Sequence, residues 1–600
     1  MPNDIIKSPT KEFQAVVAFV FWFLATCCIY TAIVLYTANE QDLFDLAALS
    51  QRWTGDNLIT RFEQLSLVLG AMAAAFSFLG GLVLFAFSKP FSESHSDWPS
   101  ELKEIGSSLT VAWFLLPRRE RQIALGALLM LTAIRFVISL LLHTFDDIAS
   151  YSSFVQEKLI VVASYYPVPN NHILSNTISW LFYQLYPGYW WSMRVPILLV
   201  STIGTIGWFL GLLRLTNFRI AAIATGLFSF LELSLFYAAE GRGYALIFVC
   251  CSLGFFCSFS LAKSQAKHTV CWLGLLVVGI LGLYAVPTFA YFLVAAYSWL
   301  GWQLCRKGES SRLISFALVG AATVLGAVLL YTPVLLVSGP RALVHNKFVQ
   351  PLAMARFFKE LPTYLFRVEG ALLGESHNGV LASFHVGSFA AGLVVIGFLL
   401  LVYAARTGRL AEYQTKRVLS VGMASLWFLL VPYLLMIAQR VQAPDRAFLF
   451  KAAFMFVLVG IELDWLLHQY RAMGRRLPIV LGCGAGLWAS VQLGQLYKSN
   501  QLRFSYASNA HAAAQWLLDQ QPGPILSHSP GYITSTTQFF IVKQRPASAL
   551  RIDETPRQGV RYRYLINPTS AGLHAEQTHL PSLHLPKTEN AEAVTIVSLW

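Results

Sequence analysis

Long apolar stretches alternate with short polar segments along most of the chain. An α-helix needs about 20 consecutive apolar residues to cross the hydrocarbon core of a bilayer. By this measure the pattern predicts thirteen spans, at residues 14–37, 65–87, 122–142, 195–213, 220–237, 244–262, 270–284, 287–304, 313–336, 386–404, 418–437, 447–467 and 477–496. The chain is therefore expected to be an all-α polytopic membrane protein.

Lys and Arg are concentrated in alternate loops, and this distribution indicates how the spans are oriented. The basic loops include 118–121, 214–219, 263–267, 306–312, 406–417 and 471–476. Cytoplasmic loops carry an excess of Lys and Arg. Because the number of predicted spans is odd, the N-terminus is expected in the cytoplasm and the C-terminal tail on the outer side.

The tail has short apolar runs in place of long ones. Runs at 524–526, 539–542, 564–566 and 594–597, with a helical segment near 510–518, indicate a small α/β domain outside the membrane. The predicted regions are a two-span extension with a cytoplasmic linker (1–120), a transmembrane core (121–497) with outer loops 143–194 and 337–385, and the outer α/β domain (498–600).

Composition supports the membrane class. Of the 600 residues, 56% are hydrophobic and 12% are charged, and the mean hydropathy is +0.55. Soluble domains are about 45–50% apolar and about 25% charged. The net charge of +13 is spread over many short loops, which is typical of membrane topology and not of a nucleic-acid-binding face. All eight cysteines lie in or beside apolar runs, so a disulfide framework or a cysteine metal site is not expected.

Two adjacent acidic residues, Asp146 and Asp147, follow the third predicted span. Charged residues held at a membrane boundary often mark a functional site, although such a pair can also simply mark where a helix leaves the lipid. Further polar segments are predicted on the same side: the loop Pro167–His172, Arg194 with Pro196, the turn Glu240-Gly-Arg242-Gly-Tyr244, and Arg446. The acids after the first span, Glu40, Asp42 and Asp45, are a rival position for the site, but no Pro-rich aromatic loop and no Arg-x-Pro span follow them.

In this order the motifs resemble the bacterial branch of the GT-C membrane glycosyltransferases, which includes the aminoarabinose–lipid A transferases and relatives of the protein O-mannosyltransferases. The resemblance covers residues 121–497. The chain departs from the family pattern in its two additional N-terminal spans and in having Asp where the second acid is more often Glu. The resemblance implies a multi-pass protein of the bacterial inner membrane. It also implies an inverting transfer of a hexosyl or pentosyl group from a polyprenyl-phosphate donor to a hydroxyl of a lipid, glycan or protein acceptor.

The resemblance also implies roles for individual residues. A carboxylate accepts the proton of the acceptor hydroxyl, and we assign this role to Asp146, with Asp147 positioning it, because adjacent helical residues point in different directions. Cations stabilise the departing phosphate; the candidates are Arg242, Arg446, Lys347 and Arg341. The expected substrate contacts are His172, Asn171, Glu240 and Tyr244, although His172 and Asn171 have a structural explanation as well.

The same sequence bears on cofactors and leaves two other functions open. No cofactor is expected, because a divalent ion needs more oxygen ligands than the pair offers and no Asp-x-Asp spacing is present at the site, but a metal is left open. A secondary transporter would show two related halves and ionisable residues near mid-membrane, where Arg135 and Glu232 are the main candidates. A polysaccharide ligase or polymerase would use a large basic outer loop, for which 337–385 is the candidate.

Overall fold

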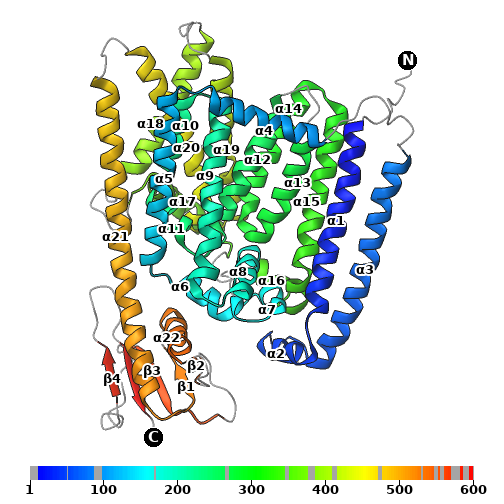
Figure 1. Cartoon of the computed structure of the whole chain (residues 1–600), viewed down its shortest axis with the longest axis vertical. Helices are drawn as coiled ribbons and strands as arrows, with labels where there is room; N and C mark the ends of the chain where they lie inside the picture. Colours follow the sequence, from blue (N-terminus) through cyan, green and yellow to red (C-terminus); the bar gives the residue numbers. More distant parts are fainter. Residues whose placement is uncertain are drawn as a thin grey trace.

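The computed structural model describes residues 11–50, 52–86, 98–167, 171–263, 269–344, 350–375, 386–407, 415–470, 476–528, 531–545, 550, 552–553, 560–568, 582–585 and 594–598. The long helices lie side by side in one bundle, and a small sheet lies at one end of it (Figure 1). We call this the sheet end; α1 begins at the opposite end, which we call the N-terminal end. The predicted class, a helical polytopic protein with a C-terminal α/β region, is confirmed.

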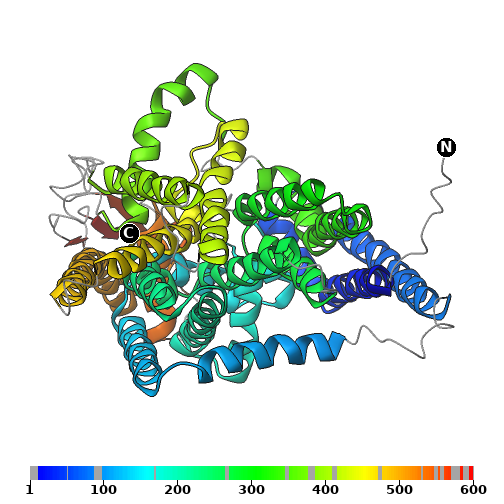
Figure 2. The same cartoon turned by 90° about the horizontal axis from the view of Figure 1, so that it is seen from above.

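Helices α1 and α3 lie along one side of the bundle (Figure 1). Helices α1 and α3 pack against each other over most of their length, and α1 also packs on α15 and α13. Helix α4 crosses the N-terminal end and contacts α9 and α13 (Figure 2). The bounds of the first four helices are α1 Lys11–Tyr36, α2 Glu40–Ser50, α3 Gly55–Ala86 and α4 Trp98–Phe114.

The remaining helices form the main part of the bundle. Its long helices are α5 Arg118–Leu141, α9 Val195–Leu215, α10 Phe218–Phe230, α12 Tyr244–Lys263, α13 Thr269–Ala285, α14 Ala290–Lys307, α15 Ser310–Val337, α17 Met354–Leu372, α18 Val386–Arg406, α19 Thr415–Gln439, α20 Leu449–Gln469 and α21 Arg476–Asp519. Shorter elements join them: α6 Phe145–Ser150, η1 Tyr151–Val155, α7 Leu159–Ser164, α8 Ile173–Leu185, η2 Trp190–Arg194, α11 Glu232–Ala239, η3 Pro287–Phe289, α16 Pro340–Val344 and η5 Asp445–Phe448.

Each of the thirteen predicted spans coincides with a helix. In the part of the chain that the structure describes, nine helices are long and apolar enough to cross a membrane, and the bent pair α10–α11 makes a tenth. The other three are α13, which has 17 residues, α14 and α20. Helix α20 is mostly buried, and its Lys451 Nζ lies 2.6 Å from Oε1 of Glu369 on α17. A buried helix with paired charges satisfies them inside the protein, so its sequence is less apolar than that of a lipid-facing span.

The predicted span 220–237 is broken. Helices α10 and α11 meet at Leu231 with an angle of 71° between them. Pro and Gly are the usual causes of a sharp kink; no Pro lies in 218–239 and Gly226 is five residues before the bend, so the sequence does not mark Leu231. After α11 the turn 240–243 reaches α6, where the N–H of Gly241 donates to Asp147 and Arg242 pairs with Asp146.

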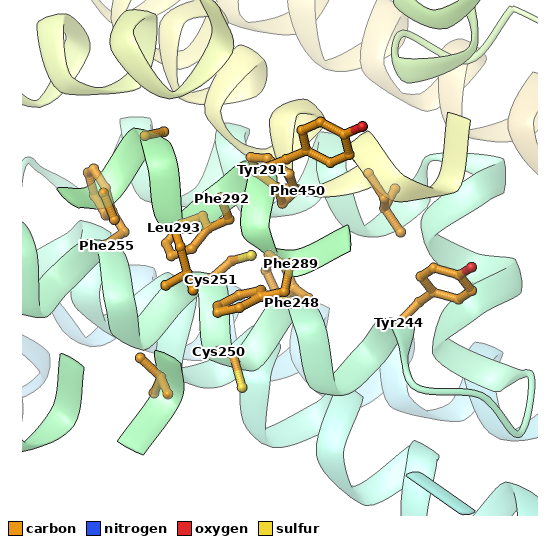
Figure 3. Close-up of a cluster of buried hydrophobic side chains, with 14 of the residues drawn as sticks. Tyr244, Phe248, Cys250, Cys251, Phe255, Phe289, Tyr291, Phe292, Leu293 and Phe450 are labelled. Carbon is orange, nitrogen blue, oxygen red and sulfur yellow. The ribbon is translucent and has the colours of Figure 1, made fainter. Parts of the chain in front are cut away.

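Aromatic side chains fill the middle of the bundle. Phe255 on α12, Phe292 on α14 and Phe450 on α20 are part of one buried cluster (Figure 3). The ring centroids of Phe292 and Phe450 are 5.6 Å apart and their planes are perpendicular, an arrangement that aromatic pairs prefer. Tyr244 begins α12 at the edge of this cluster (Figure 3). The aromatic core therefore fixes the helix from which the 240–243 turn emerges.

The C-terminal module follows α21 without a break, so one helix crosses the predicted boundary at residue 498. Three of the four apolar runs form strands, whereas the run 539–542 lies in helix α22. The sheet has the order β2-β1-β3-β5-β4; β1 pairs in parallel with β2 and β3, and β5 is antiparallel to β3 and β4. The elements are β1 Ile525–Ser527, α22 Gly531–Gln544, β2 Ile552–Asp553, β3 Tyr564–Pro568, β4 Ser582–Leu585 and β5 Val594–Ser598. Helix α22 packs on α6.

Candidate active site

The two aspartates lie in the first turn of α6 but have different surroundings. Thr144 is the N-cap residue of this helix, and acidic residues in a first turn interact favourably with the partial positive charge of a helix N-terminus. The side chain of Asp147 is fully buried, whereas 48% of the Asp146 side chain is exposed. Neighbouring positions on one turn therefore give one internal and one accessible carboxylate.

Asp147 is held by donors from three segments. Nη2 of Arg194 lies 2.8 Å from its Oδ2. The Tyr189 hydroxyl donates to Oδ1 at 2.8 Å, the backbone N–H of Gly241 donates to Oδ2 at 3.2 Å, and the hydroxyl of Thr144 also donates to Oδ1. A buried carboxylate is stable only when its charge and its lone pairs are satisfied in this way. Asp147 consequently ties α6 to η2 and to the 240–243 turn.

Arg194 completes this buried network. Its side chain is 1% exposed, and its Nη1 and Nη2 donate to the carbonyl oxygens of Ala239 at 3.2 Å and Leu142 at 3.3 Å. Sequence analysis included Arg194 only as part of the Arg-x-Pro pattern and missed its pairing with Asp147. The available signal was a guanidinium directly before an apolar span, because a buried charge requires a counter-ion.

Asp146 forms an ion pair with Arg242 from the distant turn 240–243. The Arg242 side chain is 3% exposed. Burial acts to lower the pKa of Arg242, but Tyr244, Asp146 and Glu240 outweigh it and raise that pKa. The guanidinium therefore keeps its charge, and within the described residues its buried Nε has no hydrogen-bond partner. A buried cation with an unused N–H can accept an additional anionic ligand.

His172 contacts the same turn through both ring nitrogens. Its Nδ1 lies 3.0 Å from the backbone N of Gly243, and its Nε2 lies 3.1 Å from Nη2 of Arg242. Burial, together with the charges of Arg242 and Arg446, holds the pKa of His172 well below its usual value, so the ring is neutral. A neutral imidazole has one acceptor nitrogen, and it therefore satisfies only one of these two donors.

A second guanidinium approaches from η5. Arg446 is half-buried beside Tyr244. Burial acts to lower the pKa of Arg446, but Tyr244, Tyr237 and Asp146 outweigh it and raise that pKa. The buried Nε of Arg446 has no hydrogen-bond partner among the described residues. Arg242 and Arg446 thus bring two charged groups with unused donors to one side of Asp146.

Glu240 is 1% exposed, and its Oε2 has no hydrogen-bond partner in the described part of the chain. Burial raises the pKa of Glu240 to about 8; Arg242 opposes this shift, and Asp146 and Asp147 add to it. The carboxyl group is therefore mainly protonated at neutral pH. A protonated carboxyl donates one hydrogen bond as well as accepting others.

Asp146, Asp147, His172, Glu240, Arg242, Tyr244 and Arg446 are thus brought together from segments far apart in the sequence. The other predicted site residues do not join them. The Asn171 side chain is buried and donates to the carbonyls of Val162 and Tyr165, both at 2.8 Å. Arg341 is exposed on α16, with no described contact to the cluster. Lys347 lies outside the described residues. Asp42, from the rival position, lies on α2 and pairs with Lys158 at 3.1 Å.

Sequence analysis predicted Tyr244 but missed two other tyrosines of the cluster. Tyr189 and Tyr237 are buried beside the acidic groups, and burial raises the pKa of Tyr189 far above its usual value, so its hydroxyl stays protonated and donates to Asp147. Across the residues with assigned positions, no group of three His, Cys, Asp or Glu side chains is arranged to hold a metal ion.

The described part of the chain is thus a polytopic helical bundle with a polar cluster and a small α/β module at one end. No protein-family model matches the sequence, and no curated protein matches it either. Among solved structures, the chain matches the crystal structure of ArnT from Cupriavidus metallidurans bound to undecaprenyl phosphate. This match has a TM-score of 0.50 and 11% sequence identity, and it covers 79% of this chain and 98% of ArnT. ArnT from the same organism in the apo state matches over the same shares with a TM-score of 0.38 and 11% identity. The predicted GT-C fold is confirmed.

Proposed function

We propose that this protein is a membrane glycosyltransferase that moves a sugar from a polyprenyl-phosphate donor to an acceptor hydroxyl. The observation that carries the proposal is the accessible carboxylate of Asp146 beside the buried guanidinium of Arg242, in the fold of a protein that was crystallised with undecaprenyl phosphate. The geometry provides an acid–base group and a cation in direct contact. Both are needed for the displacement of a phosphate from a sugar.

The proposed reaction is a single displacement with inversion. The acceptor oxygen forms a bond to the anomeric carbon of the sugar, while the bond from that carbon to the phosphate oxygen breaks and its electron pair leaves with the prenyl phosphate. Asp146 takes the proton of the acceptor hydroxyl. Arg242 and Arg446 face the developing negative charge of the phosphate.

The ion pair between Asp146 and Arg242 gives a reason for the donor to bind before the acceptor. While Arg242 is paired with Asp146, the guanidinium occupies part of the carboxylate that would receive the acceptor proton. A donor phosphate competes for Arg242, whose contact with His172 is only partly satisfied. In the proposed mechanism, donor binding therefore releases the carboxylate for the acceptor.

The outer-side location, the Asp147 positioning role and the substrate contacts of Glu240 and Tyr244 belong to the same proposal. Glu240 is placed to donate a hydrogen bond to a sugar hydroxyl, because its buried carboxyl is protonated near neutral pH. Neither the sugar nor the acceptor is defined by these residues. Mass spectrometry of a prenyl-phosphate sugar that copurifies with the protein would identify the donor.

The test is the Asp146→Asn variant. Its single-turnover release of prenyl phosphate from that donor is expected to fall by about 10²–10⁴-fold, the usual contribution of a general base. Binding of undecaprenyl phosphate should be retained, because Arg242 is freed from its ion pair. Arg242→Ala and Arg446→Ala should instead weaken binding of undecaprenyl phosphate.

Asp45→Asn is the matched control, since Asp45 is an exposed aspartate on α2, bonded to Gln41 and distant from the cluster. It should leave both turnover and binding unchanged. Normal turnover in Asp146→Asn would contradict the assignment of the base. Unchanged undecaprenyl phosphate binding in both alanine variants would exclude the two arginines from the phosphate site.

A further inference from the structure

A large apolar cavity lies between the N-terminal helices and the main bundle. Its volume is about 1220 Å³, above the roughly 300–1,000 Å³ of ordinary ligand pockets. Helices α1, α3, α4, α9, α12 and α13 contribute its walls. The apolar side chains around it include Leu102, Ile105, Leu109, Ile203, Leu253 and Phe256.

This cavity is separate from the candidate active site. It is lined by the first half of α1, by α9 from Ile203 to its end and by α12 from Val249 onward, and these parts lie toward the N-terminal end of the bundle (Figure 1). The Asp146 cluster is formed by the opposite ends of α9 and α12, where Arg194 and Tyr244 lie. A ligand in the cavity would thus approach from the other face of the membrane.

Helix α4 forms one wall of the cavity. Leu102, Ile105 and Leu109 recur at helical spacing and line the cavity, whereas Lys103 and Glu104 between them do not. A helix with this division of sides lies in the plane of the membrane interface, and α4 crosses the end of the bundle in this way (Figure 2). Its position leaves room for lipid chains below the helix and a headgroup beside it.

Arg214 marks the headgroup position. It lines the cavity at the end of α9, and Arg417 lies at the start of α19, a helix that packs on α9. In the described part of the chain neither arginine has an ion-pair partner. The acid Glu101 on α4 accepts a hydrogen bond from the backbone N–H of Val270 at 2.9 Å. A guanidinium in the cavity wall without a counter-ion is complementary to a phosphate, and a second cation on a helix that packs on α9 adds to the attraction.

We propose that this cavity binds an anionic phospholipid, with its acyl chains between α1, α9, α12 and α13 and its phosphate at Arg214 and Arg417. The apolar walls fit hydrocarbon, and basic pockets between transmembrane helices recognise anionic headgroups. The lipid fills the space between the two-span extension and the main bundle, and so joins the two parts.

A steric variant tests occupancy of the cavity. Gly207 lines the cavity, and a Cβ atom at this position would meet no atom within 4 Å. Gly207→Leu therefore projects into the cavity without a clash in the protein. Gly392→Leu on α18 is the matched control, since it also has open space but lies away from the cavity.

The measurement is the amount of phosphatidylglycerol that stays bound, by native mass spectrometry, after extraction from phosphatidylcholine vesicles containing phosphatidylglycerol. Gly207→Leu should abolish retention, and Gly392→Leu should match the unmodified protein. Arg214→Gln and Arg417→Gln should each weaken retention about fivefold, the effect of one basic group near an anionic surface. Arg406→Gln, an exposed cation on α18, should not.

Three results would overturn the proposal. Equal retention by Gly207→Leu would place the lipid elsewhere. Equal retention of phosphatidylcholine would remove the role of the arginines. If prenyl phosphate is recovered with the unmodified protein and is absent from Gly207→Leu, the cavity holds the prenyl chain of the sugar donor instead. None of these results depends on the transfer reaction, so failure here leaves the proposed function untouched.

Discussion

Asp146 and Asp147 show how one residue of difference along a helix changes the chemistry of a carboxylate. Asp147 is fully buried and accepts from Arg194, Tyr189 and Gly241, whereas the side chain of Asp146 is 48% exposed and pairs with Arg242. A carboxylate with all its lone pairs occupied has no position left for an acceptor proton. This difference supports Asp146 as the proposed base.

Removal of the buried cation should unfold the cluster. Arg194→Met leaves the buried charge of Asp147 without a counter-ion, which typically destabilises a protein by about 3–5 kcal/mol. The double variant Arg194→Met/Asp147→Asn removes both charges and should recover part of this loss, because Asn still accepts from Tyr189 and Thr144. Thermal unfolding of the detergent-solubilised protein measures both effects.

The matched control is the pair of Arg356 and Glu360, which are 2.8 Å apart with side chains 67% and 39% exposed. Exposed pairs contribute little to stability, so Arg356→Met should change the unfolding temperature little. Equal effects of Arg356→Met and Arg194→Met would contradict the structural role of the Arg194–Asp147 pair.

Glu240 should make stability depend on pH. Its pKa is raised by burial from 4.5 to about 8, so between these values the folded protein binds more protons at this group than the unfolded chain does. Stability therefore falls as pH rises through this window and levels off above about pH 8. The unfolding temperature should decrease more between pH 5 and pH 8.5 in the unmodified protein than in Glu240→Gln. Parallel pH curves for the two proteins would show that Glu240 does not titrate in this way.

At the scale of elements, the C-terminal module supports the helix that carries the aspartates. Phe539 of α22 packs with its ring centroid 5.1 Å from Tyr189 and 6.1 Å from Tyr151. Tyr189 in turn donates to Asp147. The module is thus in contact with a residue that holds the acidic pair.

Phe539→Ala should loosen this contact. Truncation of a buried Phe costs about 3–5 kcal/mol in a protein core, and here the loss is concentrated at the junction of α22 with α6. We expect faster limited proteolysis of the C-terminal module and slower turnover. Val560→Ala, at an exposed position of the same module, should change neither rate. Unchanged proteolysis in Phe539→Ala would exclude a supporting role for the module.

At the scale of the whole molecule, the start of α1 and the Asp146 cluster lie at opposite ends of the bundle, and the C-terminal module lies with the cluster (Figure 1). The loop cations predict that the cluster faces outward. Cysteines placed at the exposed positions Gln184 and Ser508 should be labelled by an impermeant reagent in intact cells, and one at the exposed Ser310 should not. The background needs Ser in place of the two exposed cysteines, Cys305 and Cys483. The reverse labelling pattern would move the proposed site into the cytoplasm.

The sequence by itself determined the helical class, the position of each span and the grouping of Asp146, Asp147, His172, Glu240, Arg242, Tyr244 and Arg446 at one end. Hydropathy and loop charge are summed over neighbouring residues, so they are visible before folding. Only the tertiary structure decided that Asp147 is buried against Arg194, that Leu231 bends a span, that Asn171 is committed to α7, and that a cavity forms beside Arg214. These features depend on contacts between segments far apart in the chain, such as Gly241 with Asp147, and such contacts arise from packing, which no local pattern of residues encodes.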